Sequence, residues 1–175
     1  MTKKKEVCIK IFKNNMAGIV DDAAVQALDE HGFFDAPASR HYHGAYAGGL
    51  FDHSHAVAEQ LVRLTEMLNL QWERHESPYI VAYFHDLCKM DQYCKIDGEF
   101  AYNQDVLIKG HGDKSAMLAA MYARLTEEEI LCIRYHMGAF GDKAEQAAYS
   151  KAVQKNENVL WTHTADMYAS QVKGC

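Results

Sequence analysis

The stretch from Pro78 to Lys89 constrains the fold of this chain more than any other. It reads Pro-Tyr-Ile-Val-Ala-Tyr-Phe-His-Asp-Leu-Cys-Lys. Ser77 is a favourable N-cap residue and Pro78 a favourable first helical residue, so a helix is expected to begin there. The residues that follow are apolar or aromatic on every face, which is typical of a helix in the middle of a domain. This buried helix is expected to end with His85 and Asp86 side by side.

A buried carboxylate at Asp86 needs a partner. Without a cation or hydrogen bonds, an ionised carboxylate in apolar surroundings costs several kcal/mol. Two interpretations are open from these residues alone. Either Asp86 caps part of the backbone and His85 satisfies it, or the pair binds a metal ion.

The composition is that of an ordinary globular protein, with 49% hydrophobic and 24% charged residues. The 175 residues suffice for one domain with its own core, and residues 1–175 are predicted to form that single domain. The formal charge of -6 argues against broad capture of nucleic acid or of an anionic membrane. There is no apolar run of signal-peptide or membrane-span type, so we expect a cytoplasmic protein that does not engage a membrane.

Hydrophobic periodicity predicts helices over most of the chain. Apolar residues recur at intervals of three and four over residues 6–30 and 50–68, and again after residue 111. Thr126 followed by Glu129 forms a capping-box pattern that starts another helix. The Asp97-Gly98 pair predicts the turn of a two-stranded flap between Tyr93 and Tyr102. The expected fold class is therefore all-α, with a small β-hairpin flap.

Two further features bear on chemistry. His53 falls on the apolar stripe of its predicted helix, as a satisfied core residue or as a metal ligand. The connection over residues 33–49 is long and rich in glycine and aromatic residues, which is more often functional than idle. Five cysteines without a CxxC pair favour reduced thiols over disulfides or a zinc site.

Six residues at helix ends or on inward faces form an ordered set: His53, His85, Asp86, His111, His136 and Asp166. His53, His85, Asp86 and Asp166 can hold one ion. Asp86 has two oxygens, so it can bridge to a second ion held by His111 and His136. Mixed imidazole and carboxylate ligands favour iron or manganese, with Mg, Ni and Zn as alternatives.

The ordered pieces resemble the HD superfamily of metal-dependent phosphohydrolases, which is named for its adjacent His-Asp. The matching motifs are Gly48-Gly49-Leu50-Phe51-Asp52-His53-Ser54, His85-Asp86-Leu87-Cys88-Lys89, Gly110-His111-Gly112, His136-Met137-Gly138 and Asp166. The pattern is most similar to the HD domain of bacterial 3′-to-5′ exoribonucleases. This resemblance implies an HD-domain helical bundle with a metal-binding core at about residues 33–170.

The sequence departs from the family pattern at two positions. Met137 stands where many two-metal members carry a second histidine, so a seventh ligand is missing. Six ligands can still hold two ions, as in the HD-type di-iron oxygenases that the pattern also resembles. Cys88 stands where the family usually has glycine.

The expected reaction is hydrolysis of a phosphoester by metal-activated water. Asp86, Lys89 and His43 are the predicted catalytic residues, with His43 as the general acid; Arg40 and Lys114 are predicted to bind phosphate oxygens. Four of these residues could instead have a role that involves no substrate. Lys89 and Lys114 could be solvated or form salt bridges, and Arg40 and His43 could be solvated in their loop.

We expect the substrate to be a small phosphorylated molecule, a nucleotide or short oligonucleotide, with nucleic acid entering only as a short substrate. Two other functions stay open. The same six ligands suit a di-iron oxygenase acting on a small polyol or phosphonate. The third possible function is that of a non-catalytic HD domain, which binds a nucleotide as a sensor. An acidic helical domain of this size is also compatible with a homodimer.

Overall fold

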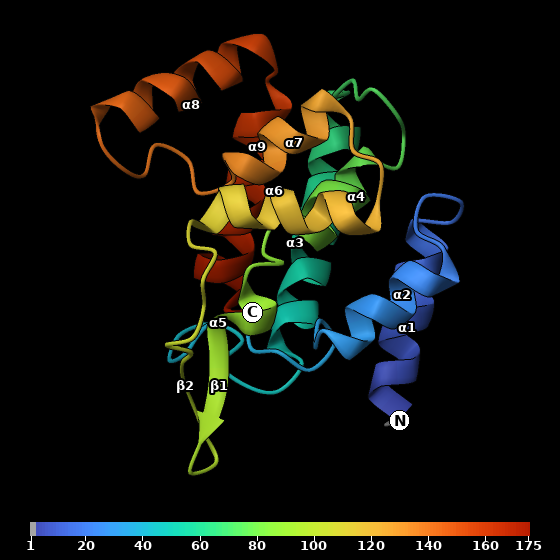
Figure 1. Ribbon diagram of the computed structural model, residues 1–175. Helices are drawn as coiled ribbons and strands as arrows, with labels where there is room; N and C mark the ends of the chain where they lie inside the picture. Colours follow the sequence, from blue (N-terminus) through green and yellow to red (C-terminus); the bar gives the residue numbers. More distant parts are fainter. Residues whose placement is uncertain (1–2) are drawn as a thin grey trace.

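A computed structural model describes residues 3–175, so Met1 and Thr2 of the basic N-terminal segment lie outside the described residues. The elements follow one another along the chain in this order (Figure 1): α1 (Lys3–Asn15), α2 (Asp22–Glu30), α3 (Gly49–Leu68), α4 (Ser77–Phe84), α5 (Lys89–Gln92), β1 (Tyr93–Ile96), β2 (Glu99–Tyr102), α6 (His111–Tyr122), α7 (Glu127–Arg134), α8 (Lys143–Lys155), α9 (Asn158–Tyr168) and the π-helix η1 (Ala169–Lys173).

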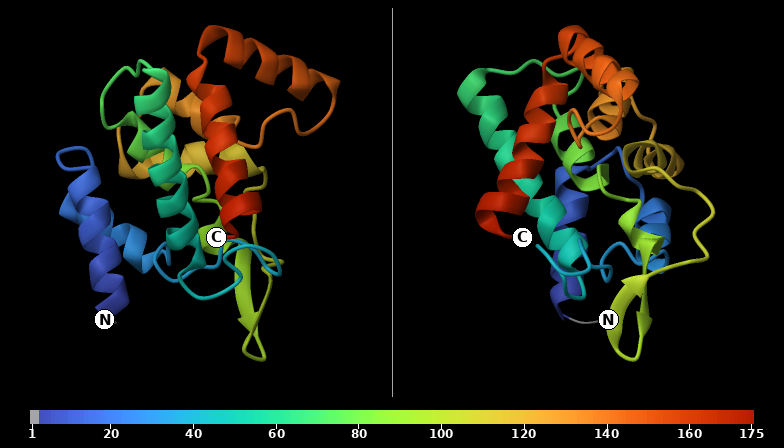
Figure 2. Two further views of the ribbon diagram at one scale, coloured as in Figure 1. Left: turned by 180° about the vertical axis from the view of Figure 1, so that it is seen from behind. Right: turned by 90° about the vertical axis from the view of Figure 1, so that its left-hand side faces the viewer.

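Helices α3, α4, α7 and α9 form the centre of the molecule. Helix α3 packs against α4 and α9, and α7 packs against α4, α6 and α9. Figure 2 shows α3 and α9 side by side, while α8 extends away from the other helices and the hairpin projects at the opposite end. The ends of α4, α6 and α7 therefore come close to α3 and α9.

Helix α4 is the buried helix that the sequence predicts. Every residue from Ile80 to Phe84 is fully buried, which confirms that this helix has no solvent face. The prediction of Ser77 as its N-cap is wrong by one position, because Glu76 precedes the helix and Ser77 is its first residue. The Ser77 hydroxyl donates instead to Glu129 on α7, at 2.8 Å, so tertiary contact replaces local capping.

An aromatic cluster attaches α1 to this core. The Phe12 ring lies 5.2 Å from that of Tyr83 and 6.0 Å from that of Phe84, measured between centroids. Phe33 and Phe34, which begin the long connection to α3, contact the same ring. Edge-on and tilted rings are the favoured arrangements of aromatic pairs. The start of this connection is therefore held in place by the core.

Two helix starts depend on specific side chains. Thr126 and Glu129 form the capping box that the sequence predicts, with each side chain bonded to the backbone of the other. Glu129 is fully buried and also accepts two bonds from the Arg74 guanidinium. Asn158 is the first residue of α9, and its amide donates to the Glu128 carboxylate.

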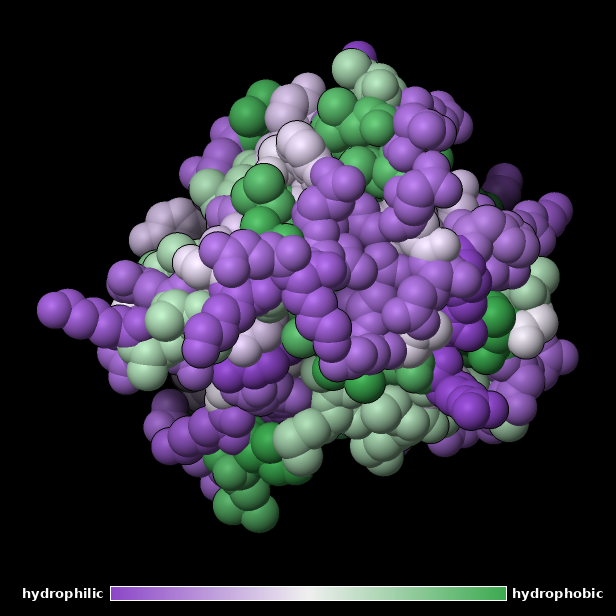
Figure 3. All heavy atoms as spheres, turned by 90° about the horizontal axis from the view of Figure 1, so that it is seen from above, coloured by the Kyte–Doolittle hydropathy of each residue, from purple (hydrophilic) through white to green (hydrophobic). Residues whose placement is uncertain are grey.

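The expected fold class is confirmed: the chain is mostly helical, with one antiparallel hairpin in which Tyr93 pairs with Tyr102. All five cysteines are free thiols, as expected. None of the helices within residues 3–175 combines the length and the apolar composition that a membrane crossing requires. Figure 3 shows the molecule from above, where hydrophilic residues cover most of the surface and hydrophobic residues form scattered groups.

Replacing Glu129 by glutamine is expected to destabilise the protein by about 3 kcal/mol, because it leaves the Arg74 guanidinium without its buried carboxylate. Glu127→Gln is the matched control on the same helix. Its ion pair with Lys155 is exposed, so the loss there is within about 0.5 kcal/mol. Urea unfolding measures both values, and equal losses in the two variants would refute the assigned role of Glu129.

Candidate metal centre

The structure brings all six predicted ligands together at the centre of the molecule. His53 comes from α3 and Asp166 from α9. His85 and Asp86 directly follow α4, and His136 lies two residues beyond the end of α7. His111 is the first residue of α6. Six side chains from separate stretches therefore meet at one point.

One part of this cluster lies between α3, α4 and α9. The Nε2 atom of His53 is 3.2 Å from Nε2 of His85 and 3.2 Å from Oδ1 of Asp166. His85 Nε2 is 3.9 Å from the same carboxylate oxygen. Both imidazoles are fully buried.

Asp86 connects this part of the cluster to the other histidines. Its Oδ2 atom lies 3.7 Å from His53 Nε2 and 3.6 Å from His85 Nε2. Its Oδ1 atom lies 2.6 Å from His111 Nε2 and 3.6 Å from His136 Nε2. The two oxygens thus face different histidine pairs, which is the arrangement that a bridging carboxylate needs.

Backbone carbonyls determine which nitrogen of three histidines carries a hydrogen. His53 Nδ1 donates to the Cys175 carbonyl at 2.8 Å. His85 Nδ1 donates to the Ala82 carbonyl and His136 Nδ1 to the Ile133 carbonyl, both at 2.7 Å. A carbonyl oxygen only accepts, so each Nδ1 bears the hydrogen and each neutral ring presents a bare Nε2 lone pair to the cluster. Metal-binding histidines commonly have such a partner on the other nitrogen.

The carbonyl partners of His85 and His136 follow from their place in the chain. The last turn of an α-helix leaves its carbonyls without intrahelical partners. His85 follows α4 and bonds the carbonyl three residues back, and His136 follows α7 and does the same. Each histidine therefore satisfies a helix end and at the same time points its Nε2 atom inward.

Two close approaches hold these helix ends in position. A Cβ atom on Gly112 would lie 1.9 Å from the Arg134 carbonyl oxygen, so only glycine allows the start of α6 to meet the end of α7. A Cβ atom on Gly138 would lie 2.6 Å from the His163 ring. His163 in turn donates from Nδ1 to the His136 carbonyl at 2.7 Å.

The donor set fits a cation. Lone pairs of His53 and His85 face each other and two carboxylates within a buried space, an arrangement that is repulsive unless positive charge lies among them. The Nε2 atom of His136 is buried and has no hydrogen-bond partner. Buried polar atoms are almost always satisfied, so such an atom marks the place of a missing ligand. This buried His/Asp cluster could hold a metal ion.

The protonation states of the cluster agree with this interpretation. Burial lowers the pKa of His85 to about 4, so the ring is neutral at pH 7. Burial also acts against charge on His53, but Asp166 and Asp86 outweigh it and raise the pKa of His53. Burial disfavours the charged form of Asp166, yet the hydrogen bond from His53 brings its pKa down to about 2.

Sequence reasoning missed one donor. A thiol sulfur from Cys88, a carboxylate oxygen from Asp86 and an imidazole nitrogen from His111 lie within 4.8 Å of one another. The other donor groups of this size are His53, His85 and Asp86, and His85, His136 and Asp166. In the sequence, the indication of this donor is Cys88 itself, because it stands where the HD superfamily, which the chain resembles, usually has glycine.

Lys89 lies beside the cluster and is buried. Its Nζ atom donates to the Ala38 carbonyl at 2.8 Å, which uses one of three donors and leaves two for another acceptor. Burial acts against the charged amine, but the nearby Asp86 carboxylate outweighs it and raises the pKa of Lys89. Lys89 is thus neither solvated nor committed to a direct ion pair.

His43 also lies at the cluster, with its ring centroid 4.9 Å from that of His53. It is half-buried and not simply solvated. Burial, reinforced by His53 and Lys89, lowers the pKa of His43. The ring is therefore neutral at pH 7 in the metal-free protein, which suits accepting a proton better than donating one.

The two predicted phosphate-binding residues are engaged elsewhere. Lys114 is buried and forms an ion pair with Asp91, which is the plainer alternative for this residue. Arg40 is exposed and contacts the hairpin, donating from Nε to the Phe100 carbonyl at 3.1 Å. Its guanidinium carbon lies 5.8 Å from the Tyr102 ring centroid. Their roles in substrate binding stay predictions.

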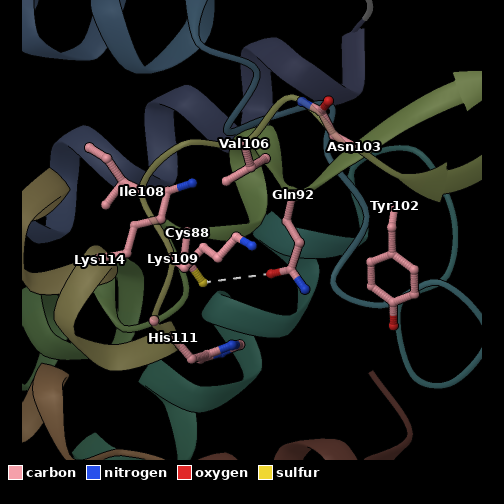
Figure 4. Close-up of a pocket in the computed structure, with 10 residues that line it drawn as sticks. Cys88, Gln92, Tyr102, Asn103, Val106, Ile108, Lys109, His111 and Lys114 are labelled. Atoms are coloured by element: carbon pink, nitrogen blue, oxygen red, sulfur yellow. Dashed lines mark hydrogen bonds between the residues drawn. The ribbon is translucent and has the colours of Figure 1, made fainter.

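Two cavities reach the cluster at His111, and a third borders the neighbouring His43. One of about 220 Å³ is lined by Cys88, His111 and Lys114 together with residues that follow the hairpin (Figure 4). A second, of about 250 Å³, lies on the other side of His111 against the end of α7. The largest, about 550 Å³, is lined by Tyr42, His43, Ser170, Gln171 and Gly174.

Comparison of the chain with models of known protein families, with curated proteins and with solved structures gives no match. Membership of the HD superfamily therefore stays a prediction that depends on the motifs. The geometry of the cluster is an independent observation on the same residues.

Adding Mn²⁺ is expected to stabilise the protein. At about 100 times the dissociation constant, binding contributes about 2.7 kcal/mol, which corresponds to about 5–10 °C in the midpoint of thermal unfolding. Asp86→Asn should lose this shift because it removes the carboxylate shared by both donor sets. Asp105→Asn, which changes an exposed carboxylate, is the control and should keep it. An equal shift in both variants would place the ion elsewhere.

Proposed function

We propose that this protein is a metal-dependent phosphohydrolase of the HD type. The observation that carries the proposal is the convergence of His53, His85, His136 and two carboxylates on one buried point, with the hydrogen-bearing nitrogens turned away to carbonyls. The motif resemblance and this geometry concern the same residues but are separate arguments.

Six residues would hold one or two divalent ions, with iron or manganese favoured by the mixed imidazole and carboxylate donors: His53, His85, Asp86, His111, His136 and Asp166. When bound, such ions lower the pKa of water toward neutrality and offset charge that develops on a phosphoryl group. Asp86 is the residue that we assign to both ions, because its two oxygens face different histidine pairs.

Lys89 is assigned to the phosphoryl group. It is a buried cation beside Asp86 with two unused donors, so it can bind non-bridging oxygens without a large desolvation change on substrate arrival. His43 borders the largest cavity and contacts His53, so it can exchange a proton with the leaving oxygen. Arg40, which contacts the hairpin, lies farther out and would contact a distal part of the substrate.

A small phosphorylated substrate fits this site better than a polymer. The cavity beside His43, at about 550 Å³, is within the range of about 300–1,000 Å³ for small-molecule sites. The net charge of -6 disfavours long polyanions, so nucleic acid would act only as a short substrate. We therefore propose a nucleotide or short oligonucleotide.

Release of phosphate from monoesters, or of a nucleotide from diesters, tests the proposal directly. Mononucleotides, dinucleotides, cyclic dinucleotides and short oligonucleotides would be assayed anaerobically with Mn²⁺, Fe²⁺ and Mg²⁺, and one class is expected to be hydrolysed. Asp86→Asn should abolish turnover, and Asp105→Asn should not change it. Saturable nucleotide binding without product in the metal-loaded protein would refute hydrolysis. In a parallel assay under air, oxygen consumption with a polyol or phosphonate, in place of hydrolysis, would identify an oxygenase instead.

His43→Gln separates proton transfer from metal binding. Loss of general acid or base catalysis is expected to lower kcat by about 10²–10⁴-fold. Metal content should be unchanged, because His43 is not among the six ligands. Unaltered kcat in this variant would remove His43 from the mechanism and leave the metal centre as proposed.

A further inference from the structure

Cys88 is the one donor in the cluster that the proposed mechanism does not use. It directly follows Leu87 in the turn between α4 and α5 and is 3% exposed. Its sulfur, a carboxylate oxygen of Asp86 and an imidazole nitrogen of His111 lie within 4.8 Å of one another. In Figure 4, Cys88 and His111 line the same cavity from different segments of the chain.

The Cys88 thiol makes only weak side-chain contacts. It lies 3.9 Å from Gln92 Oε1 and also contacts the Ser115 hydroxyl. The backbone of Cys88, in contrast, is held firmly, because its N–H donates to the Ser115 hydroxyl on α6 at 3.2 Å. The sulfur is thus positioned by the fold but not engaged by it.

The distances suit coordination of one ion. Zinc bonds to sulfur at about 2.3 Å and to imidazole nitrogen at about 2.0–2.1 Å, so donors around one tetrahedral ion lie about 3.3–3.8 Å apart. Donors 4.8 Å apart would therefore have to approach one another by about 1.0–1.5 Å. His111 is partly exposed, so it can give up its hydrogen bond to Asp86 and turn its lone pair to the ion.

We infer that Cys88 is a thiolate ligand of a second metal ion, together with Asp86 and His111. The inference deepens the proposed function and depends on the metal centre assigned there. His136 then belongs to the first ion, because its donor nitrogen groups with those of His85 and Asp166. The thiol loses its proton to solvent through the adjoining cavity when the metal–sulfur bond forms, so atoms and charge balance.

A thiolate changes which ions the second site selects. Sulfur is a soft ligand that favours zinc, iron and cobalt, whereas Mg²⁺ takes oxygen ligands. The second site should therefore bind Zn²⁺ or Co²⁺ far more tightly than Mg²⁺. This preference is absent from a site built only from Asp86, His111 and His136.

Cobalt titration detects a metal–sulfur bond directly. Purified wild-type protein is titrated anaerobically with Co²⁺ and a thiol-free reductant, and near-ultraviolet absorption from thiolate-to-cobalt charge transfer is expected as the second equivalent binds. Cys88→Ser should lose this absorption and bind the second equivalent at least about tenfold more weakly. The double variant Cys94→Ser/Cys175→Ser removes the two half-buried thiols and should keep both properties.

Zinc X-ray absorption on the double variant tests the inference without altering Cys88. A sulfur shell at about 2.3 Å is expected. Two bound ions with only nitrogen and oxygen neighbours, or charge-transfer absorption that persists in Cys88→Ser, would overturn it. Neither result depends on catalysis: phosphate release without a sulfur signal refutes the thiolate alone, and a sulfur signal without turnover refutes the hydrolase alone.

Discussion

Three hydrogen bonds from imidazole Nδ1 atoms to backbone carbonyls determine what the centre of this molecule can do. They place the hydrogens of His53, His85 and His136 on the outer side of the rings. The inner side of these rings then presents acceptors toward two largely buried carboxylates. Positive charge is needed to offset the repulsion among these acceptors, and a metal ion would supply it.

The ends of the helices position these ligand histidines. Buried helix α4 and helix α7 both stop just before a ligand histidine, and each histidine takes up a carbonyl that the helix leaves free. The absence of a side chain at Gly112 lets the end of α7 approach the start of α6, where His111 lies. Ligand positions thus follow from where helices end and how closely those ends pack.

Much of this could be predicted from local sequence. The apolar run after Pro78, the Thr126–Glu129 capping box and the Asp97-Gly98 turn each specify their element by short-range physics, and all three are confirmed. Contacts between distant segments could not be predicted in this way. No local pattern shows that His53 bonds the Cys175 carbonyl, that Cys88 faces His111, or that Lys114 pairs with Asp91. Nor does any local pattern show that His55 bonds the Tyr83 hydroxyl.

Anomalous diffraction from crystals soaked in Mn²⁺ tests the central claim most directly, because it locates the ion without reference to activity. The account predicts a peak enclosed by His53, His85, Asp86 and Asp166, with any second peak on the far side of Asp86 toward His111. A fully soaked crystal with no peak among these side chains, or with peaks only at surface carboxylates, would contradict it.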